Sequence, residues 1–81
     1  MIIKVIGAGC AECGRLYENT LAAARESGIP DIEIQKIEDL IEIVKLGVLS
    51  APSLMIDGKL AVSGQVAKKD EILHLIRSSN A

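Results

Sequence analysis

The hydrophobic pattern changes its period several times along the chain, and this constrains the fold more than any other feature. Residues 2–6 are apolar apart from Lys4 and rich in β-branched side chains, which predicts a buried strand closed by Gly7-Ala8-Gly9. Over residues 10–27 the apolar side chains recur with the helical period, and Gly28 is a suitable residue to end that helix. The chain therefore begins as a strand followed by a helix.

The rest of the chain alternates in the same manner between strand-like and helix-like segments. In chain order we expect a strand at 31–37, a short helix at 39–46 stopped by Gly47, strands at 53–56 and 60–63 joined by an Asp-Gly hairpin turn, and a helix at 68–78 with frayed residues 79–81. The predicted order is β-α-β-α-β-β-α, an α/β domain that covers residues 1–81. A parallel first βαβ unit and a closing hairpin give a four-stranded mixed sheet flanked by three helices.

Composition excludes several functional classes. The formal net charge is −2 and no basic cluster is present, so the electrostatic signature of a nucleic-acid-binding protein is missing. Lys4 splits the first apolar run, and no stretch approaches the roughly 20 apolar residues of a membrane span, so we expect neither a secretory signal nor a membrane segment. We therefore expect a cytoplasmic protein. In that compartment a lone pair of cysteines is more often catalytic or metal-binding than structural.

The two cysteines, Cys10 and Cys13, lie at the junction between the first strand and the first helix. Residues three apart on a helix are close enough for a disulfide, so this pair can open and close without a large backbone movement. A helix N-terminus favours the thiolate, and we expect a lowered pKa for Cys10. Cys13 falls on the helix stripe predicted to be buried, which also contains Leu16, Tyr17, Thr20, Leu21 and Ala24. We therefore assign Cys10 as the nucleophile and Cys13 as the resolving thiol.

The residues around the cysteines allow more than one interpretation. Gly7 and Gly9 fit either a tight turn or a backbone rim that faces a substrate, whereas a dinucleotide-binding loop fails because Glu12 occupies its third glycine position. Glu12 should disfavour a thiolate and Arg15 should favour it. Lys4 is either an edge-strand lysine that discourages aggregation or a charge that tunes the thiol.

Three further residues have simple interpretations. Pro52 belongs just before a strand, and base rates alone favour a trans peptide bond in front of it. Tyr17 lies on the apolar stripe of the first helix and is expected in the core. His74 falls opposite the apolar face of the last helix and is expected in solvent.

Taken together, Cys10-Ala11-Glu12-Cys13, Pro52, the Asp57-Gly58 turn and the final helix resemble the thioredoxin superfamily over residues 1–78. The chain is most similar to small archaeal and bacterial thioredoxin-like, glutaredoxin-sized redox-active disulfide proteins. The resemblance implies a thioredoxin-like fold, a cis Pro52 that faces Cys10, and the roles of nucleophile for Cys10 and resolving thiol for Cys13. We expect Gly9, Ala51 and Pro52 to contact the substrate. The chain differs from ordinary thioredoxins in having Gly9 before the first cysteine and Ala-Glu between the two cysteines. Lys4 also stands at the position where ordinary thioredoxins have a buried aspartate.

The leading hypothesis is a dithiol–disulfide oxidoreductase that reduces protein disulfides. It would need no cofactor besides a redox-active Cys10–Cys13 disulfide, and a thioredoxin-reductase-like electron donor would reduce it again. We expect a monomer. The alternative is a soft-metal-binding module or metallochaperone that uses the same thiolates, although such domains are typically β-α-β-β-α-β and end in a strand. A noncatalytic interaction domain is a third possibility.

Overall fold

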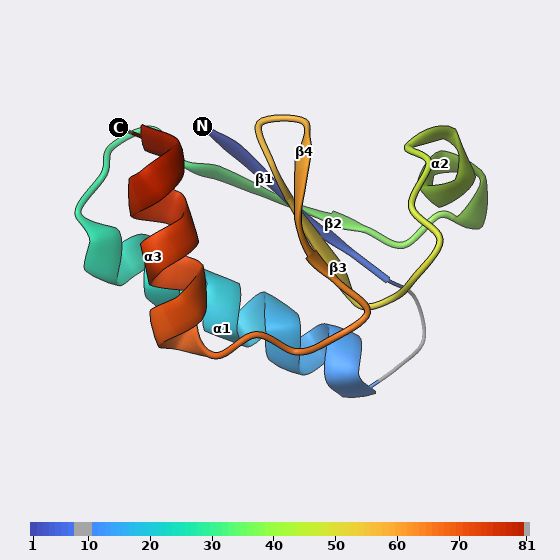
Figure 1. The fold of residues 1–81 in the computed structure, drawn as a ribbon, viewed down its shortest axis with the longest axis horizontal. Coiled ribbons are helices and arrows are strands. Elements are labelled where there is room, and N and C mark those ends of the chain that lie inside the picture. Colours follow the sequence, from blue (N-terminus) through green and yellow to red (C-terminus); the bar gives the residue numbers. More distant parts are fainter. Residues whose placement is uncertain (8–10, 81) are drawn as a thin grey trace.

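The structure is a computed structural model that describes residues 1–7 and 11–80. Its elements are β1 (Ile2–Ile6), α1 (Ala11–Ser27), β2 (Glu33–Ile37), α2 (Leu40–Lys45), β3 (Ser53–Ile56), β4 (Lys59–Ser63) and α3 (Lys69–Asn80). The predicted order β-α-β-α-β-β-α is therefore confirmed, and Figure 1 shows these elements arranged around one twisted sheet.

The four strands form a mixed sheet in the order β2-β1-β3-β4. β1 pairs in parallel with β2 and antiparallel with β3, and the β3–β4 hairpin is antiparallel. The first parallel pair requires a crossover, which α1 provides. β1 is consequently a central strand, so the interpretation of Lys4 as an edge-strand lysine is wrong.

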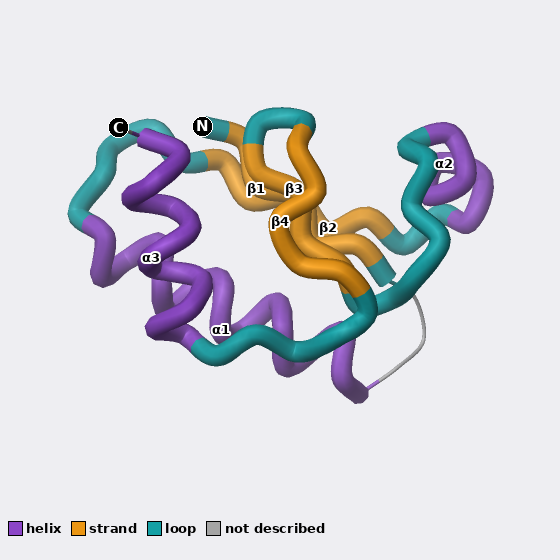
Figure 2. The backbone as a smooth tube through the Cα atoms, in the orientation of Figure 1, coloured by secondary structure: helices purple, strands orange, loops and turns teal. Residues whose placement is uncertain are grey.

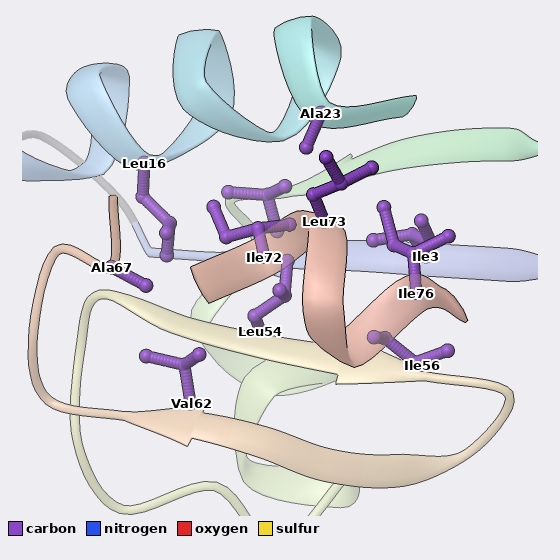
Figure 3. Close-up of a cluster of buried hydrophobic side chains, with 11 residues drawn as sticks. Ile3, Leu16, Ala23, Leu54, Ile56, Val62, Ala67, Ile72, Leu73 and Ile76 are labelled. Carbon is purple, nitrogen blue, oxygen red and sulfur yellow. The ribbon is translucent and has the colours of Figure 1, made fainter. Parts of the chain in front are cut away.

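The main core lies between one face of the sheet and the helices α1 and α3. Odd-numbered residues of β1, Ile3 and Val5, point to this face because successive strand side chains alternate. They pack with Leu16 of α1 and with Ile72 and Leu73 of α3, and Figure 3 shows the cluster between the helices and the strands. The burial of these side chains is what holds the two helices against the sheet.

α1 and α3 also contact each other through polar groups. Asn19 Nδ2 of α1 donates a 2.9 Å hydrogen bond to the carbonyl oxygen of Ala67, just before α3. Lys69 Nζ and Glu26 Oε2 form a 2.7 Å ion pair between half-exposed side chains. The end of the loop into α3 and the first residue of α3 are thus both held against α1.

A smaller cluster occupies the opposite face, where α2 lies (Figure 1). It contains Ile6, Ile37, Val48 and Met55, with Ile43 and Leu46 packed against it. Asp39 caps α2, since its Oδ1 accepts a 3.0 Å hydrogen bond from the Ile41 amide. The helix predicted at 39–46 is therefore confirmed as Leu40–Lys45, with Asp39 and Leu46 as its caps.

Some predicted bounds differ from the structure. The second strand begins at Glu33 rather than at residue 31, because Asp31 has a positive φ of 61° and turns the chain. Residues 79 and 80 were expected to fray, but α3 continues to Asn80. On α1 the buried stripe includes Ala23, which packs near Leu73, while Leu21 is only half-buried. The predicted helix start at Cys10 lies outside the described residues.

Candidate functional site

Cys13 is placed by the first turn of α1 and is almost fully buried, with 3% of its surface exposed. The helical stripe predicted this burial, and the structure confirms it. Cys10 and Gly9, two further residues predicted in the site, lie outside the described residues. Cys13 is therefore the cysteine whose surroundings the structure describes.

Gly7 lies at the end of β1 directly against Cys13. A Cβ atom at Gly7 would overlap Cys13 Sγ, would lie 3.3 Å from Cys13 Cβ, and would lie 3.6 Å from Ala51 Cβ. Its φ of 153° is one that residues with side chains rarely adopt. The Gly7 amide also donates a 3.0 Å hydrogen bond to the Ile37 carbonyl oxygen, which fixes the backbone there. Only glycine fits between the cysteine and the loop opposite.

The loop opposite contains Ala51 and Pro52, which directly precede the central strand β3. Their peptide bond is cis, as the family resemblance implies and contrary to the base rate for X-Pro bonds. Pro52 is buried and Ala51 is exposed. The structure thus brings Gly7, Cys13 and Ala51 together from three separate segments.

Ser53 holds this loop in position. The side chain is fully buried, and its Oγ donates a 2.6 Å hydrogen bond to the Ser50 carbonyl oxygen. The same Oγ accepts a longer bond, 3.4 Å, from the Gly64 amide at the end of β4. A Cβ at Gly64 would lie 3.2 Å from Ser50 Cβ, so the loop before β3 and the loop after β4 meet at one end of the sheet (Figure 2).

Sequence reasoning did not assign Ser53 to the site. A serine beside Leu54, Met55 and Ile56 in a strand buried along its whole length is the available signal, because a buried hydroxyl requires hydrogen-bond partners. Gly7 was recognised as a turn or close-approach residue, but its contact partner could not be named. Ala51, one of the residues beside Gly7, is distant along the chain, so local sequence patterns do not place it there.

The structure also places Lys4, Tyr17 and His74. Lys4 projects from the face of β1 opposite to Ile3 and Val5, whereas Cys13 belongs to a helix on their side. Tyr17 packs against the core, with Lys36 Nζ 5.2 Å from its ring centroid. His74 is exposed, as predicted.

Comparison with known proteins identifies the family. The family model described as a thioredoxin domain matches residues 1–77. The chain belongs to the thioredoxin family. This is a family of thiol–disulfide oxidoreductases, and the thioredoxin-like α/β fold of the sheet and helices described above is consistent with it.

Two curated relatives, both archaeal and both named thioredoxin, are similar over nearly their whole length. The protein from Methanothermobacter thermautotrophicus is 40% identical over 76 residues, which cover 94% of this chain and 97% of the relative. The protein from Methanocaldococcus jannaschii is 33% identical over 78 residues, covering 96% of this chain and 88% of the relative.

The described elements follow the order β-α-β-α-β-β-α, which differs from the β-α-β-β-α-β order of the soft-metal-binding alternative. The thioredoxin-family chain has α3 as its last described element, whereas the heavy-metal-associated domains end in a strand. Among residues 1–7 and 11–80, no three His, Cys, Asp or Glu side chains lie close enough together to hold a metal ion. Within the same residues, no helix is both long and apolar enough to cross a membrane.

Proposed function

We propose that this protein is a dithiol–disulfide oxidoreductase that reduces protein disulfides through Cys10 and Cys13. The observation that carries the proposal is the burial of Cys13 in the first turn of α1, in contact with Gly7 and close to Ala51. The buried Cys13, together with the nucleophilic Cys10 that the sequence predicts, makes the two thiols of the motif unequal. Such inequality suits stepwise disulfide exchange better than symmetric capture of a metal ion.

In the first step the Cys10 thiolate attacks one sulfur of the substrate disulfide. A Cys10–substrate mixed disulfide forms, the substrate S–S bond breaks, and the released substrate thiolate takes a proton from solvent. In the second step the Cys13 thiolate attacks Cys10 Sγ. The Cys10–Cys13 disulfide forms, the second substrate thiolate leaves and is protonated, and two electrons have passed from the protein to the substrate.

The start of α1 supports the first step. Cys10 immediately precedes Ala11, where α1 begins, and the unpaired amide groups and positive end of a helix stabilise a thiolate. Ala51 is exposed beside buried Pro52, so its backbone is available to pair with an extended substrate segment. Gly9, Ala51 and Pro52 are the proposed substrate-binding residues.

The oxidised protein needs a two-electron donor before it can act again. We propose a dithiol donor of the thioredoxin-reductase type, which would reduce the Cys10–Cys13 disulfide by the reverse exchange. No cofactor is required for either half-reaction. The partners are thus disulfide-containing proteins on one side and a reductase on the other.

Reduction of insulin by pre-reduced protein tests this function. The wild type should release the insulin chains, Cys10→Ser should be inactive, and Cys13→Ser should accumulate a mixed disulfide through Cys10, detected by mass spectrometry. Ser63→Ala, an exposed change on β4, serves as the control and should behave as wild type. A reduced protein that exchanged with no disulfide and instead bound one metal ion through both thiols would overturn the proposal.

A further inference from the structure

The side of α2 that faces solvent is unusually apolar. Leu40, Ile41 and Val44 expose 70%, 67% and 75% of their surfaces, and no residue of α2 is buried. These three residues and Lys45 line an open hollow of about 430 Å³. Leu49, in the loop after α2, is 99% exposed. We call Leu40, Ile41, Val44 and Leu49 the α2 surface.

The exposure of these side chains does not mean that α2 is detached from the rest of the fold. Ile43 and Leu46 pack against the smaller buried cluster described above, so the helix is anchored by other side chains. Large exposed apolar side chains gathered on one short segment usually mark an interaction site. The α2 surface is therefore available for a ligand that the described residues do not themselves provide.

The α2 surface adjoins the proposed site along the chain at both ends. Ile37, which ends β2 before α2, accepts the hydrogen bond from Gly7, and Gly7 contacts Cys13. At the other end, Leu49 precedes Ala51 by two residues. The exposed Leu49 is therefore carried on the same loop as Ala51, the residue proposed to meet the substrate.

The charge around the α2 surface indicates the chemistry of the ligand. Glu38, Asp39 and Glu42 are exposed on this segment, with only Lys45 to offset them. Residues 38–49 thus have a formal charge of −2, the same as the net charge of −2 for the whole chain, so the remaining residues balance to zero. Two copies of such a surface would repel one another, whereas a cationic partner would be attracted.

Resting on the function proposed above, we propose that the α2 surface selects disulfide substrates whose cysteine lies in an apolar, lysine- or arginine-rich segment. Apolar side chains of the substrate occupy the hollow beside Leu40, Ile41 and Val44. Its cationic side chains pair with Glu38, Asp39 and Glu42 at the edge. The preference for these substrates arises from their contacts with the α2 surface and not from the reactivity of the cysteines.

Two disulfide peptides that differ only in the charge of their flanking residues test the proposal. Each has the same leucine-rich segment around the disulfide, flanked by lysines in one and by glutamates in the other. With pre-reduced protein at low ionic strength, we expect the lysine peptide to react about three- to tenfold faster, a range set by a few weak, exposed charge pairs. Added salt should reduce that ratio toward one.

Two double variants with the same change in charge locate the preference. Glu38→Lys with Glu42→Lys should reverse the ratio between the peptides. Glu18→Lys with Glu71→Lys, both exposed and located on α1 and α3, should keep the wild-type order. Leu49→Ser should slow both peptides while keeping their ratio.

Hydroxyethyl disulfide, a small neutral substrate, separates this inference from the proposed function. If the wild type reduces neither this compound nor either peptide, the oxidoreductase function itself fails. If it reduces the compound but reacts equally with both peptides, or if reversal at Glu38 and Glu42 leaves the order unchanged, the proposed selection is wrong. A concentration-dependent dimer that Val44→Ser abolishes would instead assign the surface to a second copy of the chain.

Discussion

At the residue scale, the site depends on a glycine that has no side chain and on a serine that has a buried hydroxyl. Gly7 leaves room for Cys13 Sγ, and no other residue could do so without moving either the cysteine or the loop at Ala51. Ser53 contributes the opposite device, a single buried hydroxyl that satisfies one carbonyl and one amide of the surrounding loops. Both residues act by fixing backbone near the cysteine.

We predict that Gly7→Ala destabilises the protein by roughly 1–3 kcal/mol, because the new methyl group overlaps Cys13 Sγ in a backbone conformation unfavourable to alanine. Gly14→Ala is the matched control, since nothing lies within 4 Å of a Cβ at this helical position. Alanine there should stabilise by about 0.5–1 kcal/mol. Urea denaturation of both variants measures the difference, and equal stabilities would contradict the contact at Gly7.

Ser53→Ala should cost about 1–3 kcal/mol, because it leaves the Ser50 carbonyl and the Gly64 amide without their buried partner. Ser63→Ala removes a hydroxyl from the residue that pairs with Ser53 across the hairpin, but its side chain is exposed. That control should change the free energy of unfolding by less than about 0.5 kcal/mol. Thermal denaturation in which the two variants unfold together would contradict the role of Ser53.

At the scale of elements, the hydrophobic periodicity and the positions of glycine and proline predicted the order of strands and helices. Asp57-Gly58 forms the expected two-residue turn between β3 and β4, and Gly28 and Gly47 have the positive φ values expected after helices. These signals are local, so they can be read from adjacent residues. The outward side of α2 could not be predicted, because apolar periodicity marks a helix without stating which side meets the sheet.

The helix α3 should be the most sensitive element to truncation of a core side chain. Ile72 is fully buried between α1 and the sheet, so Ile72→Ala should destabilise by about 2–5 kcal/mol through lost burial and a cavity. His74→Ala, two residues away on the exposed side, should change stability by less than about 0.5 kcal/mol. Urea denaturation measures both values. An Ile72→Ala variant as stable as the wild type would mean that α3 is not held by this core.

At the scale of the whole molecule, the site joins segments that are far apart in sequence, and this is the part that sequence patterns could not supply. Gly7, Cys13 and Ala51 meet only once β1, α1 and β3 are assembled. The sequence predicted both cysteines and Pro52 as site residues by motif and resemblance. It could not show that Lys4 lies on a central strand, since strand order depends on pairings between distant segments.

The ion pair between α1 and α3 predicts how stability varies with pH. A hydrogen bond and the charge of Lys69 lower the pKa of Glu26 below its ordinary value of 4.5, and the same contacts raise the pKa of Lys69 above 10.5. A lowered carboxyl pKa stabilises the folded state above pH 4.5, and this is lost as pH falls through the folded pKa. The raised pKa of Lys69 stabilises the folded state below pH 10.5, and this stabilisation is lost as pH rises through the folded pKa.

Glu26→Gln should therefore lower the Tm slightly at neutral pH, and the difference from wild type should vanish in strong acid and in strong base. High salt should also shrink it, because both side chains are near half-exposed. Glu18→Gln, an exposed change on the same helix, is the control. Calorimetry across pH makes the comparison, and a Tm difference independent of pH would contradict the pair.

The central position of β1 has a consequence for synthesis. This strand is synthesised before both of its neighbours in the sheet, β2 and β3, which end at Ile37 and Ile56. The nascent chain can pair one edge of β1 with β2 early, but the other edge stays unpaired until β3 has emerged. Domains whose contacts join distant residues fold slowly for this reason. The two cysteines thus emerge from the ribosome well before the loop that completes their surroundings.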